Sequence, residues 1–280
     1  MQTLLEVLRK TITFFEGKGV EHPKHDAEQL FAHVLGCKRL DLYLQHERPL
    51  SDEQLAALRP VVARRGKREP LQHILGDTVF HGLTLKVDRR ALIPRHETEE
   101  LVEHLIATLG QHPPGCVLDL GTGTGALALA LAHHWPAAEV WAVDQSETAL
   151  SLARENADAL NLSARVSFRQ GNWLEGMDRT FDLIVSNPPY LTQPEWETAS
   201  PEVRDHEPRE ALVAEDDGLA DLTLLVQNSR QYLADGGLLA LETGIAHHAR
   251  LAEQAETAGY TRHASLRDLQ HRDRFFFAWR

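Results

Sequence analysis

The chain has 280 residues, of which 42% are hydrophobic and 25% are charged, so it can form a globular protein with a sizeable core. Its net charge of −12 argues against a protein that binds nucleic acid by neutralising phosphates. Two cysteines, Cys37 and Cys116, do not make a disulfide framework, and no apolar stretch approaches the roughly 20 residues of a membrane span. We therefore expect a cytoplasmic protein without a signal peptide or membrane anchor.

The first 75 residues have the pattern of a small helical domain. Their apolar side chains recur at helical spacing, as at Leu4, Leu8, Ile12 and Phe15. Ser51 and Gln54 form a capping box that predicts the start of a further helix, and Gly36 is expected to end an earlier one. The basic run 64–68 either complements the dipole of the helix that it ends, which we favour, or contacts a polyanion.

A change of period marks the boundary with a second domain. Leu83, Leu85 and Val87 alternate with polar residues after a His81-Gly82 turn, which predicts a linking β-hairpin over residues 76–90. In residues 91–280 helical and extended patterns alternate, as in a doubly wound parallel sheet. The expected strands are Cys116–Leu120, Val140–Val143, Val166–Arg169, Leu183–Ser186, Leu238–Glu242, Thr261–Leu266 and Phe275–Trp279. The expected helices are Glu99–Leu109, Thr124–His134, Glu147–Leu160, Ala220–Leu233 and Ala246–Ala258.

A glycine-rich loop follows the first strand of that sheet. It reads Gly121-Thr122-Gly123-Thr124-Gly125 and leads into an apolar helix. Glycine lets the backbone approach a ligand closely, and the helix N-terminus offers free N–H groups, so we expect a nucleoside or nucleotide here. Because Gly121, Gly123 and Ala126 also satisfy the relaxed dinucleotide fingerprint, an NAD-binding fold remains an alternative at this point.

Polar residues at the neighbouring strand ends favour S-adenosylmethionine as the ligand. Asp119 precedes the first glycine by two residues, where a carboxylate can meet the ammonium group of the methionine part and would repel a pyrophosphate. Asp144 ends the next strand, at the distance expected of an acid that accepts the ribose hydroxyls. Asn172 and Trp173 follow the third strand, and we expect them to flank the adenine.

The tetrapeptide Asn187-Pro188-Pro189-Tyr190 indicates the chemistry, because it follows an apolar strand at the end where open α/β sheets bind ligands. An amide nitrogen is a weak nucleophile because its lone pair is delocalised. The side-chain oxygen of Asn187 and the carbonyl of Pro188 can accept its two N–H groups and direct the lone pair at a methyl group. Pro189 keeps that carbonyl rigid, and Tyr190 is expected to pack against the amide plane.

These motifs resemble the bacterial peptide chain release factor N5-glutamine methyltransferase family, within the class I S-adenosylmethionine-dependent methyltransferases. The similarity covers nearly the whole chain. It includes Glu69–Gly76, Phe80–Leu83, Leu92–Glu99, Glu207–Leu212 and Asp268–Arg274. The chain departs from the family pattern at His96, where proline is usual, and at Gln270-His271, where Ala-Gly is usual. Both departures concern loop shape rather than the expected catalytic residues.

The resemblance implies a seven-stranded Rossmann-like sheet, mostly parallel with an antiparallel C-terminal hairpin, and a helical N-terminal domain that docks the substrate protein. It implies cofactor contacts from Gly121 to Gly125, Asp144, Trp173 and Asn187, and substrate contacts from Asn187 to Tyr190. The implied reaction methylates the glutamine side-chain nitrogen in the Gly-Gly-Gln motif of a release factor and leaves S-adenosylhomocysteine. We expect no metal, no membrane or direct nucleic-acid partner, and a monomer.

Three other functions remain as alternatives. They are glutamine methylation of a ribosomal protein, methylation of the adenine amino group in nucleic acid, and binding of S-adenosylmethionine without catalysis. Leu92–Glu99 resembles the release-factor branch more than the ribosomal one. Negative charge argues against the second alternative, and an intact Asn187–Tyr190 motif argues against the third.

Other features are assigned to structure or left open. Sixteen histidines do not indicate a metal site, because neighbours such as His133-His134 and His247-His248 point in different directions on a helix, and we expect them to be exposed. Ser146 is expected to cap a helix. The acidic stretch Thr192–Asp217 is either a substrate-contacting lid or a solvated excursion.

Overall fold

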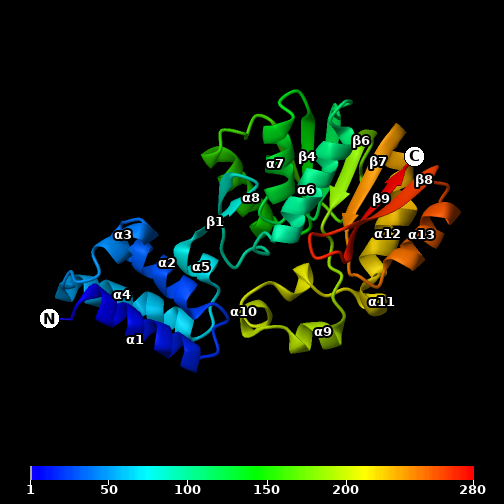
Figure 1. The fold of residues 1–280 in the computed structure, drawn as a ribbon. Coiled ribbons are helices and arrows are strands. Elements are labelled where there is room, and N and C mark those ends of the chain that lie inside the picture. Colours follow the sequence, from blue (N-terminus) through cyan, green and yellow to red (C-terminus); the bar gives the residue numbers. More distant parts are fainter. Residues whose placement is uncertain (1) are drawn as a thin grey trace. The chain divides into compact units, whose positions relative to one another are not determined.

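A computed structural model describes residues 2–280, which form two compact units (Figure 1). One unit contains the chain up to Asp77 together with Ser200–His206, and the other contains Thr78–Ala199 and Glu207–Arg280. Residues 78–90 of the hairpin fall in the second unit. The reason is its apolar face, since Phe80 and Leu85 are buried in the core of that unit.

The first unit is helical, and its apolar side chains form one core. Its elements are α1 (Leu4–Gly17), α2 (Pro23–Leu35), α3 (Arg39–Leu44), α4 (Asp52–Gly66), α5 (Leu71–Leu75) and α10 (Pro201–Arg204). The predicted capping box of Ser51 and Gln54 is confirmed at the start of α4, and Gly36 ends α2 with a left-handed φ of 62°.

Carboxylates of the first unit neutralise the basic run at the end of α4. The buried guanidinium of Arg65 binds Asp26 at 2.7 Å and Glu202 at 2.9 Å. Arg68 binds Glu202 at 2.6 Å. These arginines are therefore engaged in holding α2, α4 and the Ser200–His206 segment together, which argues against the polyanion alternative.

The second unit is built on a seven-stranded sheet with the order β5-β4-β3-β6-β7-β9-β8, and β1 and β2 pair separately. The strands are β1 (Asp77–Phe80), β2 (Leu83–Lys86), β3 (Cys116–Leu120), β4 (Glu139–Asp144), β5 (Val166–Gln170), β6 (Phe181–Ser186), β7 (Leu233–Glu242), β8 (Arg262–Arg267) and β9 (Asp273–Trp279). The first five strands of the large sheet are parallel, and β9 is antiparallel to both of its neighbours. The expected mostly parallel sheet with an antiparallel C-terminal hairpin is confirmed.

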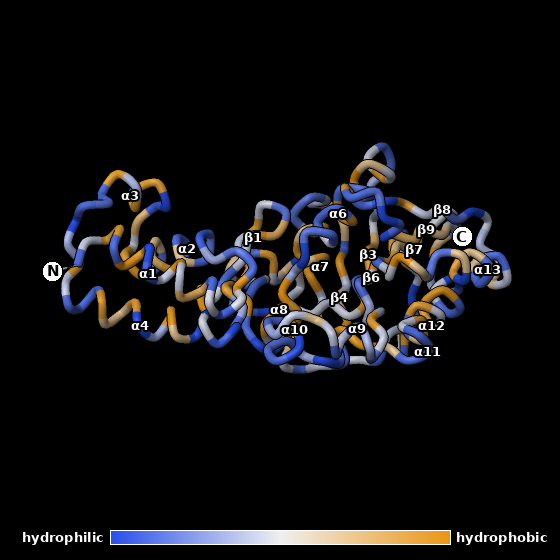
Figure 2. The backbone as a smooth tube through the Cα atoms, turned by 60° about the horizontal axis from the view of Figure 1, so that its bottom comes forward, coloured by the Kyte–Doolittle hydropathy of each residue, from blue (hydrophilic) through white to orange (hydrophobic). Residues whose placement is uncertain are grey.

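Helices cover both faces of this sheet (Figure 1). On one face are α6 (His96–Leu109), α7 (Ala126–His134) and α8 (Glu147–Ala159), and on the other are α12 (Ala220–Ser229) and α13 (His248–Thr257). Successive side chains of β3 point to opposite faces of the sheet. Val117 packs in the core under α6 and α7, and Leu118 packs in the core under α12 and α13. Figure 2 shows the central strands and α7 as predominantly hydrophobic segments.

Short helices occupy most of the acidic stretch after β6. They are α9 (Gln193–Thr198), α10, the 3-10 helix η1 (Arg209–Ala211) and α11 (Glu215–Gly218), and a second 3-10 helix, η2 (Arg230–Tyr232), follows α12. Segments of three to six residues are too short to display a helical period, which is why the sequence did not predict them. Within residues 2–280 no helix combines the length and apolar composition needed to cross a membrane.

Candidate active site

The carboxyl ends of three neighbouring strands meet at one edge of the sheet. Strand β3 lies between β4 and β6, and its last residue, Leu120, pairs with Val143 on one side and Ser186 on the other. The next residues along the chain are the first glycine of the loop, Asp144 and Asn187, so the register brings these three segments together. They line a cavity of about 990 Å³, including the part open to solvent.

Most of the predicted site residues line this cavity. They are Gly121, Thr122, Gly123, Thr124, Asp144, Asn172, Trp173, Asn187 and Pro189. Asp119, Gly125, Pro188 and Tyr190 are placed next to the lining rather than in it. Side chains that we did not predict also contribute, among them Arg90, Arg95, Thr98 and Glu210.

Left-handed backbone shapes the glycine loop. The φ angles of Gly121, Gly123 and Gly125 are +71°, +55° and +84°. The N–H groups of Gly121 and Thr122 donate to the carbonyl of Val143, at 2.9 and 3.0 Å. A Cβ on Gly121 would lie only 3.3 Å from the ring of Trp173. The loop therefore presents bare backbone beside an aromatic face, a combination that fits a nucleoside.

The main chain of the glycine loop and of the turn before α8 holds the carboxylate of Asp144. Its Oδ2 accepts from the N–H of Gly123 at 2.8 Å, and its Oδ1 accepts from the N–H of Ser146 at 2.9 Å. Burial raises the pKa of Asp144, and these backbone hydrogen bonds oppose that rise. Because each carboxylate oxygen can accept a second hydrogen bond, the side chain can still receive hydroxyl groups from a ribose. Ser146 also caps α8 through Ala149, as predicted.

Asp119 lies beneath the glycine loop. It is fully buried, and its Oδ2 accepts from Thr122 Oγ1 at 2.6 Å and from the N–H of Ala128 at 3.1 Å. Burial raises the pKa of Asp119 to about 7. No partner in the described chain reaches its Oδ1, a buried acceptor that a donor group would satisfy. The side chain thus supports the loop, and its contact with a ligand ammonium group stays a prediction.

Trp173 and Asn172 form the wall after β5. The indole N–H of Trp173 donates to Asp221 at 3.2 Å, and the side-chain nitrogen of Asn172 donates to Glu175 at 3.0 Å. Trp173 has a left-handed φ of 51°, unusual for a bulky residue, so the turn holds its ring against the glycine loop. A fixed flat apolar surface beside polar groups suits a purine base, and the adenine contact stays a prediction.

The Asn187–Tyr190 motif is held by side chains from other elements. The amide nitrogen of Asn187 donates to Thr98 Oγ1 at 3.0 Å, which leaves the amide oxygen for a ligand. The Tyr190 hydroxyl donates to Glu242 at 3.0 Å, and the Arg274 guanidinium lies 5.6 Å from the Tyr190 ring centroid. Burial and the neighbouring Glu242 raise the pKa of Tyr190, so the phenol stays a neutral donor.

Sequence reasoning missed Thr98 and Glu242. Glu242 is the last residue of β7, with a fully buried side chain, and Thr98 lies in the first turn of α6. Thr98 Oγ1 donates to Glu242 at 2.7 Å. A glutamate that ends a strand otherwise rich in leucine and alanine was the available signal, because an acid at that position needs partners or a function.

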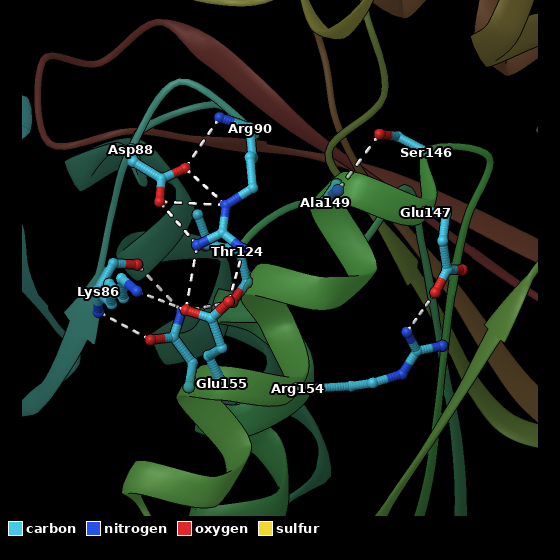
Figure 3. A network of polar contacts seen from close by, with 10 residues as sticks. Lys86, Asp88, Arg90, Thr124, Ser146, Glu147, Ala149, Arg154 and Glu155 are labelled. Carbon is cyan, nitrogen blue, oxygen red and sulfur yellow. Dashed lines mark hydrogen bonds and ion pairs between the residues drawn. The ribbon is translucent and has the colours of Figure 1, made fainter.

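The segment after β2 forms another wall of the cavity. Figure 3 shows the polar contacts that connect this segment to α8. The guanidinium of Arg90 binds Asp88 at 2.7 Å and Glu155 of α8 at 2.6 Å. Next to them the buried Asn156 donates to the carbonyl of Thr124 at 2.9 Å and accepts from the main chain of β2 at 2.7 Å. The glycine loop, α8 and this wall are thus connected by one polar network.

The end of the acidic stretch borders the same cavity. Glu207, whose side chain is buried, forms an ion pair with Arg95, and the cavity lining includes Pro208, Glu210 and Ala211. Burial raises the pKa of Glu207, and Arg95 opposes that rise. This part of the stretch is therefore packed against the cavity rather than solvated, and its contact with a substrate stays a prediction.

The expectation that the histidines are exposed is wrong for His73 and for the pair His247 and His248. Both residues of the pair are buried, at 6% and 8% exposure. His248 lies between Thr243 and Ser265, at 2.9 and 2.8 Å, while His247 approaches the carbonyl of Asp217. They point in different directions, and burial is possible because each finds a polar partner. The residues that the structure describes contain no group of three or more potential ligands able to hold a metal ion.

Known proteins resemble the chain in both units. Residues 6–76 match the PrmC N-terminal domain, and residues 96–202 match the methyltransferase small domain. A release factor glutamine methyltransferase from Geobacter sulfurreducens is 44% identical over 244 residues, which cover 87% of this chain and 84% of that protein. One from Deinococcus radiodurans is 42% identical over 278 residues, covering 99% and 98%. The chain belongs to the release factor glutamine methyltransferase family.

Membership of this family makes the chain a methyltransferase. Among solved structures, the catalytic domain of hMettl16 in complex with a MAT2A 3'UTR hairpin has a TM-score of 0.61 at 18% identity, covering 89% of this chain and 90% of that one. At such low identity the similarity concerns the fold alone. It agrees with the Rossmann-like methyltransferase sheet described above.

Proposed function

We propose that this enzyme transfers a methyl group from S-adenosylmethionine to the side-chain nitrogen of the glutamine in the Gly-Gly-Gln motif of peptide chain release factors. The observation that carries the proposal is the orientation of Asn187. Its amide nitrogen is engaged by Thr98, so its oxygen is the atom that remains for a substrate N–H group beside the glycine-loop cavity. Relatives named release factor glutamine methyltransferases support the same substrate.

The residues of the cavity fit S-adenosylmethionine, which when bound supplies an electrophilic methyl group. Backbone of Gly121–Gly125 would lie against the ligand, and Asp144 would accept the ribose hydroxyls. Asn172 and Trp173 would flank the base. The unpaired Oδ1 of Asp119 would attract the ammonium group of the ligand's methionine part, either by direct contact or across the glycine loop that Asp119 supports.

Asn187 and Pro188 act on the glutamine amide. The oxygen of Asn187 and the carbonyl of Pro188 accept its two N–H groups, which turns the nitrogen lone pair toward the methyl donor. Acceptors also stabilise the positive charge that grows on nitrogen as the new bond forms. The product nitrogen is then acidic enough to lose a proton to water, so the site needs no dedicated base.

We assign docking of the release factor to the helical unit, residues 1–75, and infer that the substrate is a protein rather than nucleic acid. The match of residues 6–76 to the PrmC N-terminal domain supports the first inference. The net charge of −12 supports the second, because phosphate recognition needs a basic surface.

Transfer of a labelled methyl group to a purified release factor tests the proposal. Label should appear on the natural factor and be absent from a variant whose Gly-Gly-Gln glutamine is changed to glutamate. Duplex DNA and ribosomal RNA serve as controls. Methylation of either nucleic acid, or equal labelling of both release factors, would contradict the proposed substrate.

A further inference from the structure

Buried side chains behind the Asn187–Tyr190 motif form a continuous hydrogen-bond chain. Asn187 donates to Thr98 at 3.0 Å, Thr98 donates to Glu242 Oε2 at 2.7 Å, and Tyr190 donates to Glu242 Oε1 at 3.0 Å. Thr98 is 4% exposed, and Glu242 is completely buried. The contacts link α6, the end of β6 and the end of β7 at the point where the motif begins.

We propose that Thr98 and Glu242 are positioning residues that fix the amide orientation of Asn187, so that its oxygen rather than its nitrogen faces the substrate. An asparagine side chain has nearly the same shape after a 180° flip, but the flip exchanges an acceptor for a donor. A donor at this position would oppose the N–H groups of a substrate amide. The orientation therefore decides whether the site can accept glutamine.

The Thr98 hydroxyl has a single hydrogen, and this fixes the donor and the acceptor in each hydrogen bond between Asn187 and Glu242. An ionised carboxylate only accepts, so Glu242 obliges the single hydroxyl hydrogen of Thr98 to point toward it. The oxygen of Thr98 is then left as an acceptor, and only the nitrogen of Asn187 can donate to it. Flipping Asn187 would place two acceptors at 3.0 Å with no hydrogen between them, which is costly in a buried site.

Charge adds to this effect. Burial raises the pKa of Glu242, and Glu97 adds to that rise. The hydrogen bond on each carboxylate oxygen and the neighbouring Arg274 favour the ionised form. Arg274 lies over the Tyr190 ring and donates to the carbonyl of Thr243 at 2.8 Å, so it is itself held in place. Negative charge relayed through Thr98 polarises the Asn187 amide and makes its outward oxygen a stronger acceptor.

The inference rests on the proposed methylation of glutamine and is tested by a matched pair of variants. Thr98→Val keeps the shape but removes the hydroxyl, whereas Thr98→Ser keeps the hydroxyl and removes the methyl group. We expect Thr98→Val to lower kcat for a release factor by about 100-fold, the size of effect that misplacement of a reacting group produces. Thr98→Ser should retain most of the activity, and the Kd of S-adenosylmethionine should be unchanged in both.

Controls separate positioning from folding. Thr108→Val changes an exposed threonine of the same helix and should leave kcat and the melting temperature unchanged. If Thr98→Val does not fold, Glu242→Gln replaces it. The neutral amide that this substitution introduces permits both directions of the chain, so we expect kcat to fall by roughly tenfold while cofactor binding persists.

Two results would overturn the inference while leaving the proposed function intact. They are a folded Thr98→Val enzyme as active as the natural one, and a Thr98→Ser enzyme as inactive as Thr98→Val. If the natural enzyme itself methylates no release factor, the proposed function fails first. The assay of the natural enzyme thus distinguishes the two failures.

Discussion

The two sides of the active site are built in different ways. On the proposed cofactor side, one contiguous loop and the residues that directly follow β4 and β5 line the cavity. On the acceptor side, Asn187 and Tyr190 depend on α6, β7 and β9, which lie far apart in the sequence. The cofactor side can be recognised from the sequence as a motif. Of the acceptor side, the sequence reveals only the Asn187–Tyr190 motif and not the residues that hold it. We expect substitutions on the cofactor side to weaken the binding of S-adenosylmethionine, and substitutions on the acceptor side to lower kcat.

The largest effect is expected for Asn187→Ala, which removes the proposed acceptor of the reacting amide. Methyl transfer should fall by about 100- to 1,000-fold, as when one preorganised hydrogen-bonding partner is lost from an active site. Cofactor affinity, measured by calorimetry, should be largely retained. Asn228→Ala, at an exposed position of α12, is the control. Full activity of Asn187→Ala would remove the acceptor role.

Asp144→Ala, in contrast, should mainly weaken the binding of S-adenosylmethionine. The side chain accepts from the N–H groups of Gly123 and Ser146, so its loss removes support of the loop as well as the expected ribose contact. We expect the Kd of S-adenosylmethionine to rise by about 10- to 100-fold, which corresponds to the roughly 1.5–3 kcal/mol of hydrogen bonds to a charged group. Asp235→Ala, at an exposed site, should leave the Kd unchanged, and an unchanged Kd for Asp144→Ala would contradict the ribose role.

Gly121→Ala tests whether cofactor binding needs the bare backbone of the glycine loop. A left-handed φ costs an alanine roughly 1–2 kcal/mol, and its Cβ would press on Trp173 at 3.3 Å. Gly36→Ala is the matched control, because Gly36 has a similar φ of +62° but no atom within 4 Å of the added carbon. Both variants should unfold at lower denaturant concentration, but only Gly121→Ala should weaken cofactor binding, by about tenfold. Equal cofactor affinities would show that the loop tolerates a side chain.

The smallest effect concerns pH. Burial raises the pKa of Glu242, while Thr98, Tyr190 and Arg274 oppose the rise and Glu97 adds to it. Protonation removes the charge that directs the hydrogen-bond chain, so kcat should fall severalfold in acid, beginning above the usual pKa range of glutamate. The pH profile of Glu242→Gln should lack this acid limb. An identical limb in that variant would assign it to another group.

Much of the fold was predictable because its signals are local. Strand Cys116–Leu120 and the helix that follows Ser146 have the predicted positions, since alternation, capping and a glycine loop are short-range patterns. The helices after β6 were missed because segments of three to six residues are held by their surroundings rather than by periodicity.

The parts of the site that directly follow a strand were predictable, whereas the residues that hold them were not. The glycine loop, Asp144 and Asn187 are adjacent in space because neighbouring parallel strands end at one edge of the sheet, and each of these motifs directly follows such a strand. Thr98 and Glu242 were missed because their partnership is a tertiary contact between residues 144 positions apart. His247 and His248 were misjudged for the same reason, because a histidine is buried only where the fold supplies its partners.

The central claim is that the Asn187 oxygen accepts a substrate N–H group, and a crystal structure tests it most directly. The crystal would contain the enzyme with S-adenosylhomocysteine and a peptide carrying the Gly-Gly-Gln motif. We predict the glutamine nitrogen within hydrogen-bond distance of Asn187 Oδ1 and of the Pro188 carbonyl, with Thr98 still bound to Asn187. A side chain of Asn187 turned away from the glutamine, or one that presents its nitrogen to it, would contradict the account.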